Sequence, residues 1–201
     1  MVDSVVIVGA SLGGLRAAEL LRRKGHAGRL TLVGDERELP YDRPPLSKQL
    51  LTGACTEEQV ALRRKPYDEL ALDLRLGVRA ERLSLAQRTV FLADGAELTY
   101  DALILATGAR ARRLPEQPEL RGLFELRTLE HARALREALR SKPRVCVIGA
   151  GFIGAEVASS ARGLGCEVTV LEALPAPLQR GLGSVLGNAL GLAANLALPS
   201  V

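Results

Sequence analysis

The sequence predicts an α/β protein with parallel strands, and two observations carry this prediction. Apolar, β-branched runs at 5–8 and 145–148 each lead into a glycine-rich turn and then into a segment with helical spacing. A second strand follows each helix, at 30–33 and at 167–171, so both turns lie inside βαβ units of ordinary length. We therefore expect two Rossmann-like, three-layer dinucleotide-binding units, both incomplete, with a β-hairpin or meander in the first.

The first unit begins at the N-terminus. Its expected elements are a strand at 5–8, a helix at 12–24, a strand at 30–33, a hairpin of strands at 88–92 and 98–100, and a strand at 103–106. Asp94 and Gly95 form a typical hairpin turn between the two antiparallel strands. A proline-rich connection occupies 40–48, and Ser47 is expected to cap a short helix that follows it.

The second unit is expected to contain a linker at 109–120, a helix at 131–140, a strand at 145–148, a helix at 153–164 and a strand at 167–171. Cys146 lies within the apolar strand and is expected to be an inert core residue. The segment after Gly183 has neither strand alternation nor a polar helix face, so we assign no regular element to it. The predicted boundaries are a first nucleotide domain at 1–110, a linker and helix at 111–142, the first βαβ unit of a second nucleotide domain at 143–183, and an uncharged tail at 184–201.

The composition argues against several classes of function. The net charge of +4 is mild and the basic residues are scattered, so we expect no nucleic-acid binding, although a basic face could attract an acidic protein. None of the three cysteines forms a C-x-x-C pair, and the two histidines are far apart, so we expect no metal site. The sequence shows no signal segment, which predicts a cytoplasmic protein that does not contact a membrane.

The second glycine-rich turn has the residues that a dinucleotide-binding turn requires. A helix N-terminus offers unpaired amide groups to a pyrophosphate, and glycines let the backbone come close to it. Gly149, Gly151 and Gly154 occupy the three glycine positions. Glu172 ends the next strand, where a carboxylate binds the ribose hydroxyls. Because this carboxylate would repel a 2′-phosphate, it favours NADH over NADPH.

The first turn departs from this pattern, because Ser11 stands in place of the middle glycine. Its small hydroxyl could hydrogen-bond a phosphate, and Gly9 and Gly14 remain in place. Asp35 and Glu36 end the next strand, and either could bind a ribose. The alternative for each turn is a tight turn that binds no ligand.

Several longer motifs resemble those of one enzyme family. They lie at 32–36, 39–48, 106–108, 126–130, 149–156 and 161–172. Together they are similar to the FAD-dependent ferredoxin, rubredoxin and putidaredoxin reductases of the pyridine nucleotide-disulfide oxidoreductase superfamily, and the resemblance extends over residues 3–183. It implies that the first turn binds FAD and the second binds NADH. It also implies an enzyme that passes electrons from NADH through FAD to a small iron–sulfur protein, ferredoxin or rubredoxin, of an oxygenase system.

The resemblance also implies roles for individual residues. Lys48 and Glu156 are implied as catalytic, with Lys48 near the reactive edge of the flavin and Glu156 pairing with it when NADH docks. Outside these motifs, each would be interpreted as an ordinary surface charge. The residues implied in FAD binding are Gly9, Ser11, Leu12, Gly13, Gly14, Asp35, Glu36, Arg43, Lys48, Ala80, Ala106, Thr107, Gly108 and Arg127. Those implied in NADH binding are Gly149, Gly151, Phe152, Ile153, Gly154 and Glu172.

Two departures from related proteins affect this expectation. The segment 43–48 lacks the cysteine pair that disulfide reductases with the same plan place beside the flavin, so the electrons are expected to leave for an external acceptor. The family pattern ends near residue 183, so we expect a chain truncated at its C-terminus with weak or no activity. The alternatives are a non-catalytic FAD- or NAD-binding fragment, or a subunit that needs a partner chain to complete its fold.

Overall fold

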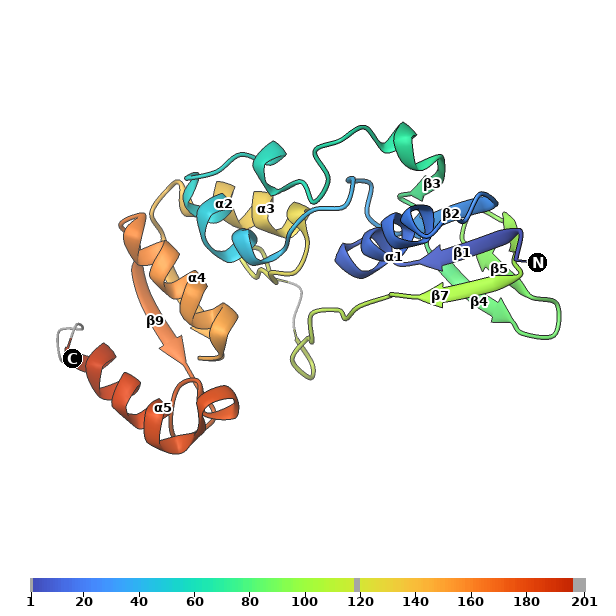
Figure 1. Ribbon diagram of the computed structural model, residues 1–201. Helices are drawn as coiled ribbons and strands as arrows, with labels where there is room; N and C mark the ends of the chain where they lie inside the picture. The colour runs from blue at the N-terminus through green and yellow to red at the C-terminus, as the bar shows by residue number, and fades with distance from the viewer. Residues whose placement is uncertain (1, 118–119, 197–201) are drawn as a thin grey trace. The chain divides into compact units, whose positions relative to one another are not determined.

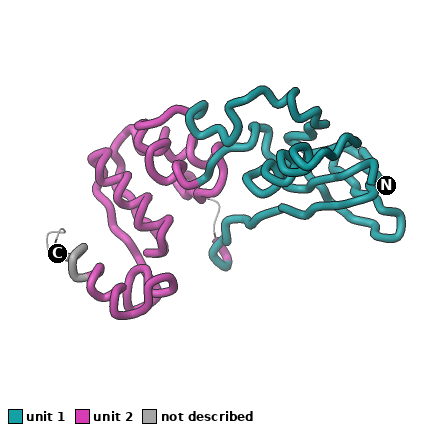
Figure 2. Tube along the Cα trace, in the orientation of Figure 1, with its two compact units in different colours: residues 1–43, 57–115 teal, residues 44–56, 116–201 magenta. Residues whose placement is uncertain are grey.

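The computed structural model describes residues 2–117 and 120–196, and the contacts in it divide the chain into two compact units. Unit 1 comprises residues 1–43 and 57–115, and unit 2 comprises residues 44–56 and 116–201 (Figure 2). The proline-rich segment at 44–56 therefore folds with unit 2, although it interrupts unit 1 in the sequence.

Unit 1 contains a parallel sheet and an antiparallel sheet (Figure 1). Its elements are β1 (Ser4–Val8), α1 (Leu12–Arg23), β2 (Arg29–Gly34), the 3₁₀ turns η2 (Glu58–Val60) and η3 (Tyr67–Leu70), β3 (Leu72–Leu76), β4 (Ala80–Ser84), β5 (Thr89–Leu92), β6 (Glu97–Thr99) and β7 (Ala102–Leu105). The parallel strands lie in the order β3-β2-β1-β7, so Ile7 of the central strand is aligned with Leu32 and with Ile104. Strands β4, β5 and β6 form the predicted antiparallel meander.

Strand β1 supplies side chains to two separate cores, one on each face of the parallel sheet. Val5 and Ile7 pack in a buried cluster with Ala18 of α1, whereas Val6 and Val8 pack with residues of β5 and β6. Because side chains alternate across a strand, a strand buried on both faces must be apolar at every position. The result is three layers (helix, parallel sheet, antiparallel sheet), which confirms the layered α/β fold predicted for this unit.

Unit 2 combines helices with a two-stranded parallel sheet, and Figure 1 labels its helices and the strand β9. Its elements are η1 (Pro44–Ser47), α2 (Gln49–Thr52), α3 (Leu129–Leu139), β8 (Arg144–Ile148), α4 (Phe152–Gly163), β9 (Glu167–Leu171) and α5 (Gln179–Leu196). The core joins Leu51 of α2, Leu139 of α3 and Ala161 of α4 to Val168 of β9. Thr128 caps α3, since its side chain accepts a hydrogen bond from the amide group of a residue in the first turn.

The expected role of Ser47 as a helix cap is wrong. Ser47 is the last residue of η1, and Lys48 occupies the N-cap position of the short helix α2 instead. The single proton of the Ser47 hydroxyl is donated to the carboxylate of Glu156, and the Pro44 carbonyl, 3.3 Å away, is the weaker acceptor. The 3₁₀ turn thus moves Ser47 one residue out of the cap position and directs its side chain toward α4.

The expectation that Cys146 is a core residue is also wrong, because its side chain is exposed. Strand β8 turns Val145 and Val147 toward the core of unit 2, so the alternating residue Cys146 faces the opposite side of the sheet. The structure also forms helix α5 where the sequence analysis assigned no element. This segment departs from helical geometry at Gly183, whose φ is +79°.

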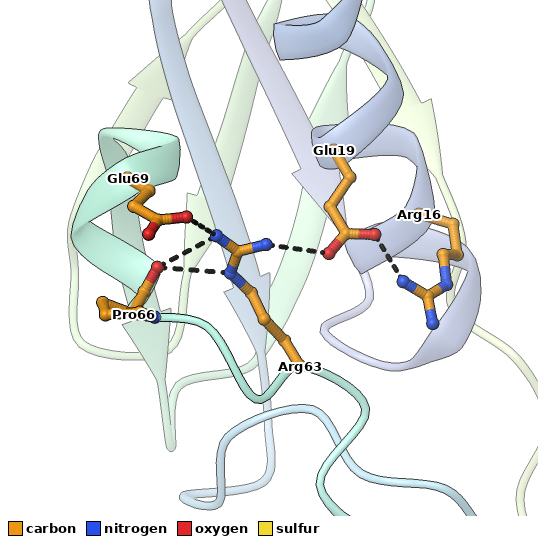
Figure 3. Close-up of polar contacts among 5 residues, drawn as sticks. All are labelled: Arg16, Glu19, Arg63, Pro66 and Glu69. Atoms are coloured by element: carbon orange, nitrogen blue, oxygen red, sulfur yellow. Dashed lines mark hydrogen bonds and ion pairs between the residues drawn. The ribbon is translucent and has the colours of Figure 1, made fainter.

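A cluster of ion pairs centred on Arg63 ties the irregular segment before β3 to helix α1 (Figure 3). The Arg63 side chain is 9% exposed, and its guanidinium lies 3.2 Å from Glu19 and 2.8 Å from Glu69. It also donates to the carbonyl group of Pro66 at 3.0 Å. Although burial raises the pKa of Glu19, hydrogen bonds and charges from Arg16 and Arg63 outweigh burial and hold this pKa below its ordinary value.

We expect the substitution Arg63→Ala to lower the free energy of unfolding by about 2 kcal/mol, because it leaves a carbonyl and two carboxylates without their shared donor. Urea unfolding followed by circular dichroism measures this change. The matched control is Arg75→Ala, which removes a solvent-exposed ion pair with Asp73 and is expected to change stability by no more than about 0.5 kcal/mol. Equal effects of the two substitutions would contradict the prediction.

Candidate nucleotide-binding sites

The first glycine-rich turn joins β1 to α1 and packs backbone against backbone. Gly9 has a φ of +117°, and a Cβ added to it would lie 2.0 Å from the carbonyl oxygen of Ala106. A Cβ added to Gly14 would lie 1.9 Å from the carbonyl oxygen of Gly9. Glycine is therefore required at both positions, at Gly9 by backbone conformation and at Gly14 by the close approach of α1 to the turn.

The second turn, between β8 and α4, has the same close approach. Gly149 has a φ of +102°, and a Cβ added to Gly154 would lie 1.9 Å from the carbonyl oxygen of Gly149. Gly151 differs, because a Cβ added there would meet no other atom of the described chain within 4 Å. Open space therefore lies beside the middle glycine, where a dinucleotide-binding turn holds its pyrophosphate.

Helices α1 and α4 both begin without a capping side chain. Ser11 is the N-cap residue of α1 and Gly151 that of α4, and neither cap provides a side-chain hydrogen bond within the described residues. The amide groups of the first turn and the positive end of the helix dipole therefore face the space in front of each helix. Each turn thus has the features of a phosphate site.

The structure places Glu172 at the second turn. Its carboxylate accepts a hydrogen bond from the amide group of Ala150 at 2.7 Å and one from that of Leu174 at 2.9 Å. These backbone donors, first Leu174 and then Ala150, lower the pKa of Glu172 below its ordinary value. A negative charge is therefore held beside the Gly149–Gly151 turn, as the spacing of the sequence predicted.

The two carboxylates that follow β2 have different partners. Glu36 accepts hydrogen bonds from the Tyr41 hydroxyl and the Arg43 guanidinium, and that guanidinium lies 5.3 Å from the centre of the Tyr41 ring. Asp35 forms a 3.5 Å ion pair with Arg79, and both of these side chains are about half exposed. Glu36 thus belongs to a compact cluster with Tyr41 and Arg43, whereas the Asp35 carboxylate has one long contact within the described residues.

Lys48 and Glu156 form an ion pair within unit 2, with the Lys48 Nζ atom 2.8 Å from a carboxylate oxygen of Glu156. The Ser47 hydroxyl donates to the other oxygen of this carboxylate, and the buried Ser160 hydroxyl donates to the Ser47 carbonyl at 2.7 Å. Hydrogen bonds from Lys48 and then Ser47 lower the pKa of Glu156. The two serines were not predicted as partners, because they contact residues more than 100 positions away in sequence.

The other predicted site residues divide between the two units. Unit 1 contains Leu12, Gly13, Ala80, Thr107 and Gly108, and unit 2 contains Arg127, Phe152 and Ile153. In unit 1, Val8 is aligned with Val33 and with Leu105, so the carboxyl ends of β1, β2 and β7 lie at one edge of the sheet. This alignment brings the first glycine turn, the start of the 106–108 segment and the acidic pair after β2 to the same edge.

In the ranges 2–117 and 120–196, no group of three or more histidine, cysteine, aspartate or glutamate side chains could hold a metal ion. None of the helices described there is long and apolar enough to cross a membrane.

Comparison with known proteins identifies similar sequences and folds. The profile of the family described as Pyridine nucleotide-disulphide oxidoreductase matches residues 3–194. The chain is 44% identical over 188 residues to the biphenyl dioxygenase system ferredoxin–NAD(+) reductase component of Paraburkholderia xenovorans, covering 93% of this chain and 46% of that protein. It is 42% identical over 187 residues to the rubredoxin-NAD(+) reductase of Pseudomonas putida, covering 92% of this chain and 49% of that protein.

Among solved structures, the fold is similar to that of a chain in the covalent putidaredoxin reductase–putidaredoxin complex. The TM-score is 0.89 at 36% sequence identity, and the match covers 97% of this chain and 48% of the other. The chain thus spans about half the length of the relatives that it matches.

We expect Gly154→Ala to lower the free energy of unfolding by about 2 kcal/mol or more, because a Cβ 1.9 Å from a carbonyl oxygen displaces α4 from its turn. Gly163→Ala is the matched control on the same helix. A Cβ there meets no described atom within 4 Å beyond its chain neighbours and the backbone of its own helix, so stability is expected to stay unchanged or rise by up to about 1 kcal/mol. Thermal unfolding measures both variants, and an equally stable Gly154→Ala protein would refute the close contact.

We expect Lys48→Met to raise the pKa of Glu156 toward the ordinary glutamate value, because the variant loses the hydrogen bond and charge of the ammonium group. Since folding lowers this pKa, the ion pair stabilises the folded wild-type protein at pH values above the ordinary glutamate pKa. This stabilisation disappears as the pH falls through the lowered pKa of Glu156. An NMR titration of the Glu156 carboxyl carbon reports the change. Lys142→Met is the control and is expected to leave the Glu156 pKa at its wild-type value. An unchanged Glu156 pKa in Lys48→Met as well would contradict the prediction.

Proposed function

Because the chain belongs to the pyridine nucleotide-disulphide oxidoreductase family, we propose that it is the nucleotide-binding part of an FAD-dependent NADH oxidoreductase. The protein passes electrons from NADH through FAD to a small iron–sulfur protein, ferredoxin or rubredoxin, of an oxygenase system. The observation that carries this proposal is that each unit has one glycine turn in front of an uncapped helix, so the chain can bind two dinucleotides.

FAD is assigned to unit 1. Its pyrophosphate would lie against Gly9 and the residues 11–14, where the amide groups at the start of α1 supply donors. Asp35 is the preferred partner of the adenosine ribose, because Glu36 is already held by Tyr41 and Arg43. Further FAD contacts within unit 1 are assigned to Arg43, Ala80, Ala106, Thr107 and Gly108.

NADH is assigned to unit 2. The open space beside Gly151 fits its pyrophosphate, and the tight packing at Gly154 brings α4 close to the turn. Phe152 and Ile153, whose side chains are exposed at the start of α4, complete the assigned contacts. The Glu172 carboxylate would accept hydrogen bonds from the ribose and repel a 2′-phosphate, which favours NADH over NADPH.

Lys48 and Glu156 are the proposed catalytic pair. When bound, the flavin supplies the redox chemistry, accepting electrons as a pair and releasing them singly. The chain contributes a cation at a defined position: Glu156 holds the Lys48 ammonium group at 2.8 Å, while Ser47 and Ser160 fix the carboxylate and the backbone behind it. The segment 43–48 contains no cysteine, so the proposed electron acceptor is external to the chain.

One observation favours a second candidate function, that of a subunit completed by a partner chain. Ile148 and Leu171 end the two strands of the β8–β9 sheet, and their side chains are 57% and 53% exposed. Apolar side chains at the end of a short sheet are normally covered by further structure. For either function the proposed location is the cytoplasm, where the three cysteines, all free in the structure, stay reduced.

We expect the purified chain to bind FAD, to be yellow, and to lose its flavin absorbance when NADH is added anaerobically. NADPH is expected to require at least about a tenfold higher concentration for the same loss of flavin absorbance, because Glu172 repels its 2′-phosphate. Absorbance spectra with each nucleotide provide the measurement. Glu172→Gln should reduce the preference for NADH over NADPH in this assay. Glu167→Gln, at the opposite end of β9, should leave that preference unchanged.

Yellow protein that NADH does not bleach would overturn the proposed reductase activity and favour a non-catalytic nucleotide-binding fragment. Colourless, insoluble protein that becomes soluble on co-expression with a second chain would favour the partner-dependent subunit.

A further inference from the structure

A small cavity lies at the end of α3 in unit 2, away from the glycine turn of that unit. Its volume is about 240 Å³, and the residues that line it are Leu51, Thr52, Arg136, Leu139, Arg140, Lys142 and Leu164. Leu164 follows the last residue of α4, whereas the glycine turn precedes the first. Because α4 has 12 residues, the two places are separated by about 18 Å along the helix.

Three cationic side chains surround this cavity. Gly53 is the C-cap residue of α2, and a Cβ added to it would lie 2.7 Å from an Nη atom of Arg136. The Arg136 guanidinium therefore lies over the C-terminus of α2. The position of a Cβ on Gly165 lies 3.5 Å from the Nζ atom of Lys142. Arg140 forms an ion pair with Glu137 at 2.8 Å.

The charges around the cavity are not balanced within the described part of the chain. The exposed side chains of Arg136 and Lys142 form no hydrogen bond or ion pair there, and of the three cations only Arg140 has a carboxylate partner, Glu137. Three positive groups and one negative group therefore leave the cavity with two positive charges. The C-termini of α2, α3 and α4 all lie at the cavity, where cations offset the helix dipoles, but partial charges of about one half each sum to less than two full charges.

Apart from Thr52, the remaining residues that line the cavity are leucines. Leu51 and Leu139 are 0% and 2% exposed in the core of unit 2, and the half-buried Leu164, which packs against that core, supplies the apolar surface that a ligand can reach. The cavity thus combines a cationic rim with an apolar floor. Its volume is below the range typical of drug-sized ligands, so it suits a small molecule with an anionic group and a short apolar body.

We infer that this cavity is a binding site for a small phosphoryl compound, with a dianionic phosphate held by Arg136, Arg140 and Lys142 and an apolar group on the leucine floor. A phosphate monoester carries nearly two negative charges at neutral pH, which matches the unbalanced charge. A guanidinium presents paired donors that suit phosphate oxygens, and an ammonium group adds a point charge. This inference is independent of the proposed reductase activity.

The position of the site links it to Lys48. The amide group and the hydroxyl of Thr52, at the cavity edge, both donate to the Lys48 carbonyl, at 2.9 Å and 3.1 Å. Arg136 reaches the other end of the same short helix at Gly53. A phosphate bound by Arg136 of α3 would therefore restrain the C-terminus of α2. Because Thr52 at that end is hydrogen-bonded to the Lys48 carbonyl, the backbone of Lys48 would be restrained as well.

Isothermal titration calorimetry of the purified chain, in a low-salt buffer without other multivalent anions, tests the inference with phenyl phosphate as the probe. We expect saturable binding of one phenyl phosphate per chain. Inorganic phosphate should bind more weakly because it leaves the leucine floor uncovered, and benzoate should bind at least about tenfold more weakly because it carries one charge. Benzoate binding equal to that of phenyl phosphate would overturn the dianion assignment.

Variants locate the site. Arg136→Gln and Lys142→Gln are each expected to weaken phenyl phosphate binding about tenfold or more, through loss of a charge-assisted hydrogen bond. The matched control is Arg144→Gln, an exposed cation outside the cavity lining, which should bind like the wild type. Thermal unfolding without ligand confirms that each variant is folded. Absence of saturable binding to the wild type, or undiminished binding to a folded Arg136→Gln, Lys142→Gln double variant, would overturn the proposal.

Discussion

The contact on which the structure depends most is the packing of a helix against a glycine turn, backbone on backbone. It occurs once in each unit, at Gly14 on Gly9 and at Gly154 on Gly149, with room for a hydrogen atom but not for a methyl group. This approach sets the height of the helix over its sheet. It thereby directs uncapped amide groups into the space at the end of the preceding strand, β1 or β8, which is the place where a dinucleotide-binding fold holds a phosphate.

A second constraint comes from the path of the chain. The segment 44–56 leaves unit 1 and folds with unit 2, so Lys48 is held by residues that follow it by more than 100 positions. Its partner Glu156 projects from α4, the helix that also forms the second glycine turn. One helix therefore carries a nucleotide turn at its N-terminus, the lysine-binding carboxylate in its first half, and one wall of the cationic cavity beyond its end.

Both βαβ units could be predicted because their signals are local: apolar runs, helical spacing, and glycines where a turn meets a helix. Strand β3 was not predicted, since it lies at the sheet edge and pairs with β2 residues that are 42 positions earlier, such as Leu30 with Leu72. Cys146 was misjudged because an apolar strand sequence does not reveal which of its faces a core will cover. Ser47 was misjudged because a 3₁₀ turn and a helix cap have similar sequences.

By itself the sequence determined the α/β class, the two glycine turns, and the carboxylate that meets the second one. Each of these depends on the conformation of a few consecutive residues or on the fixed length of a βαβ unit. Only the tertiary structure decided that Glu36 is held by Tyr41 and Arg43, that Glu156 holds Lys48, and that three cations meet over a leucine floor. Those arrangements join side chains from separate elements, and packing, rather than local sequence, brings such elements together.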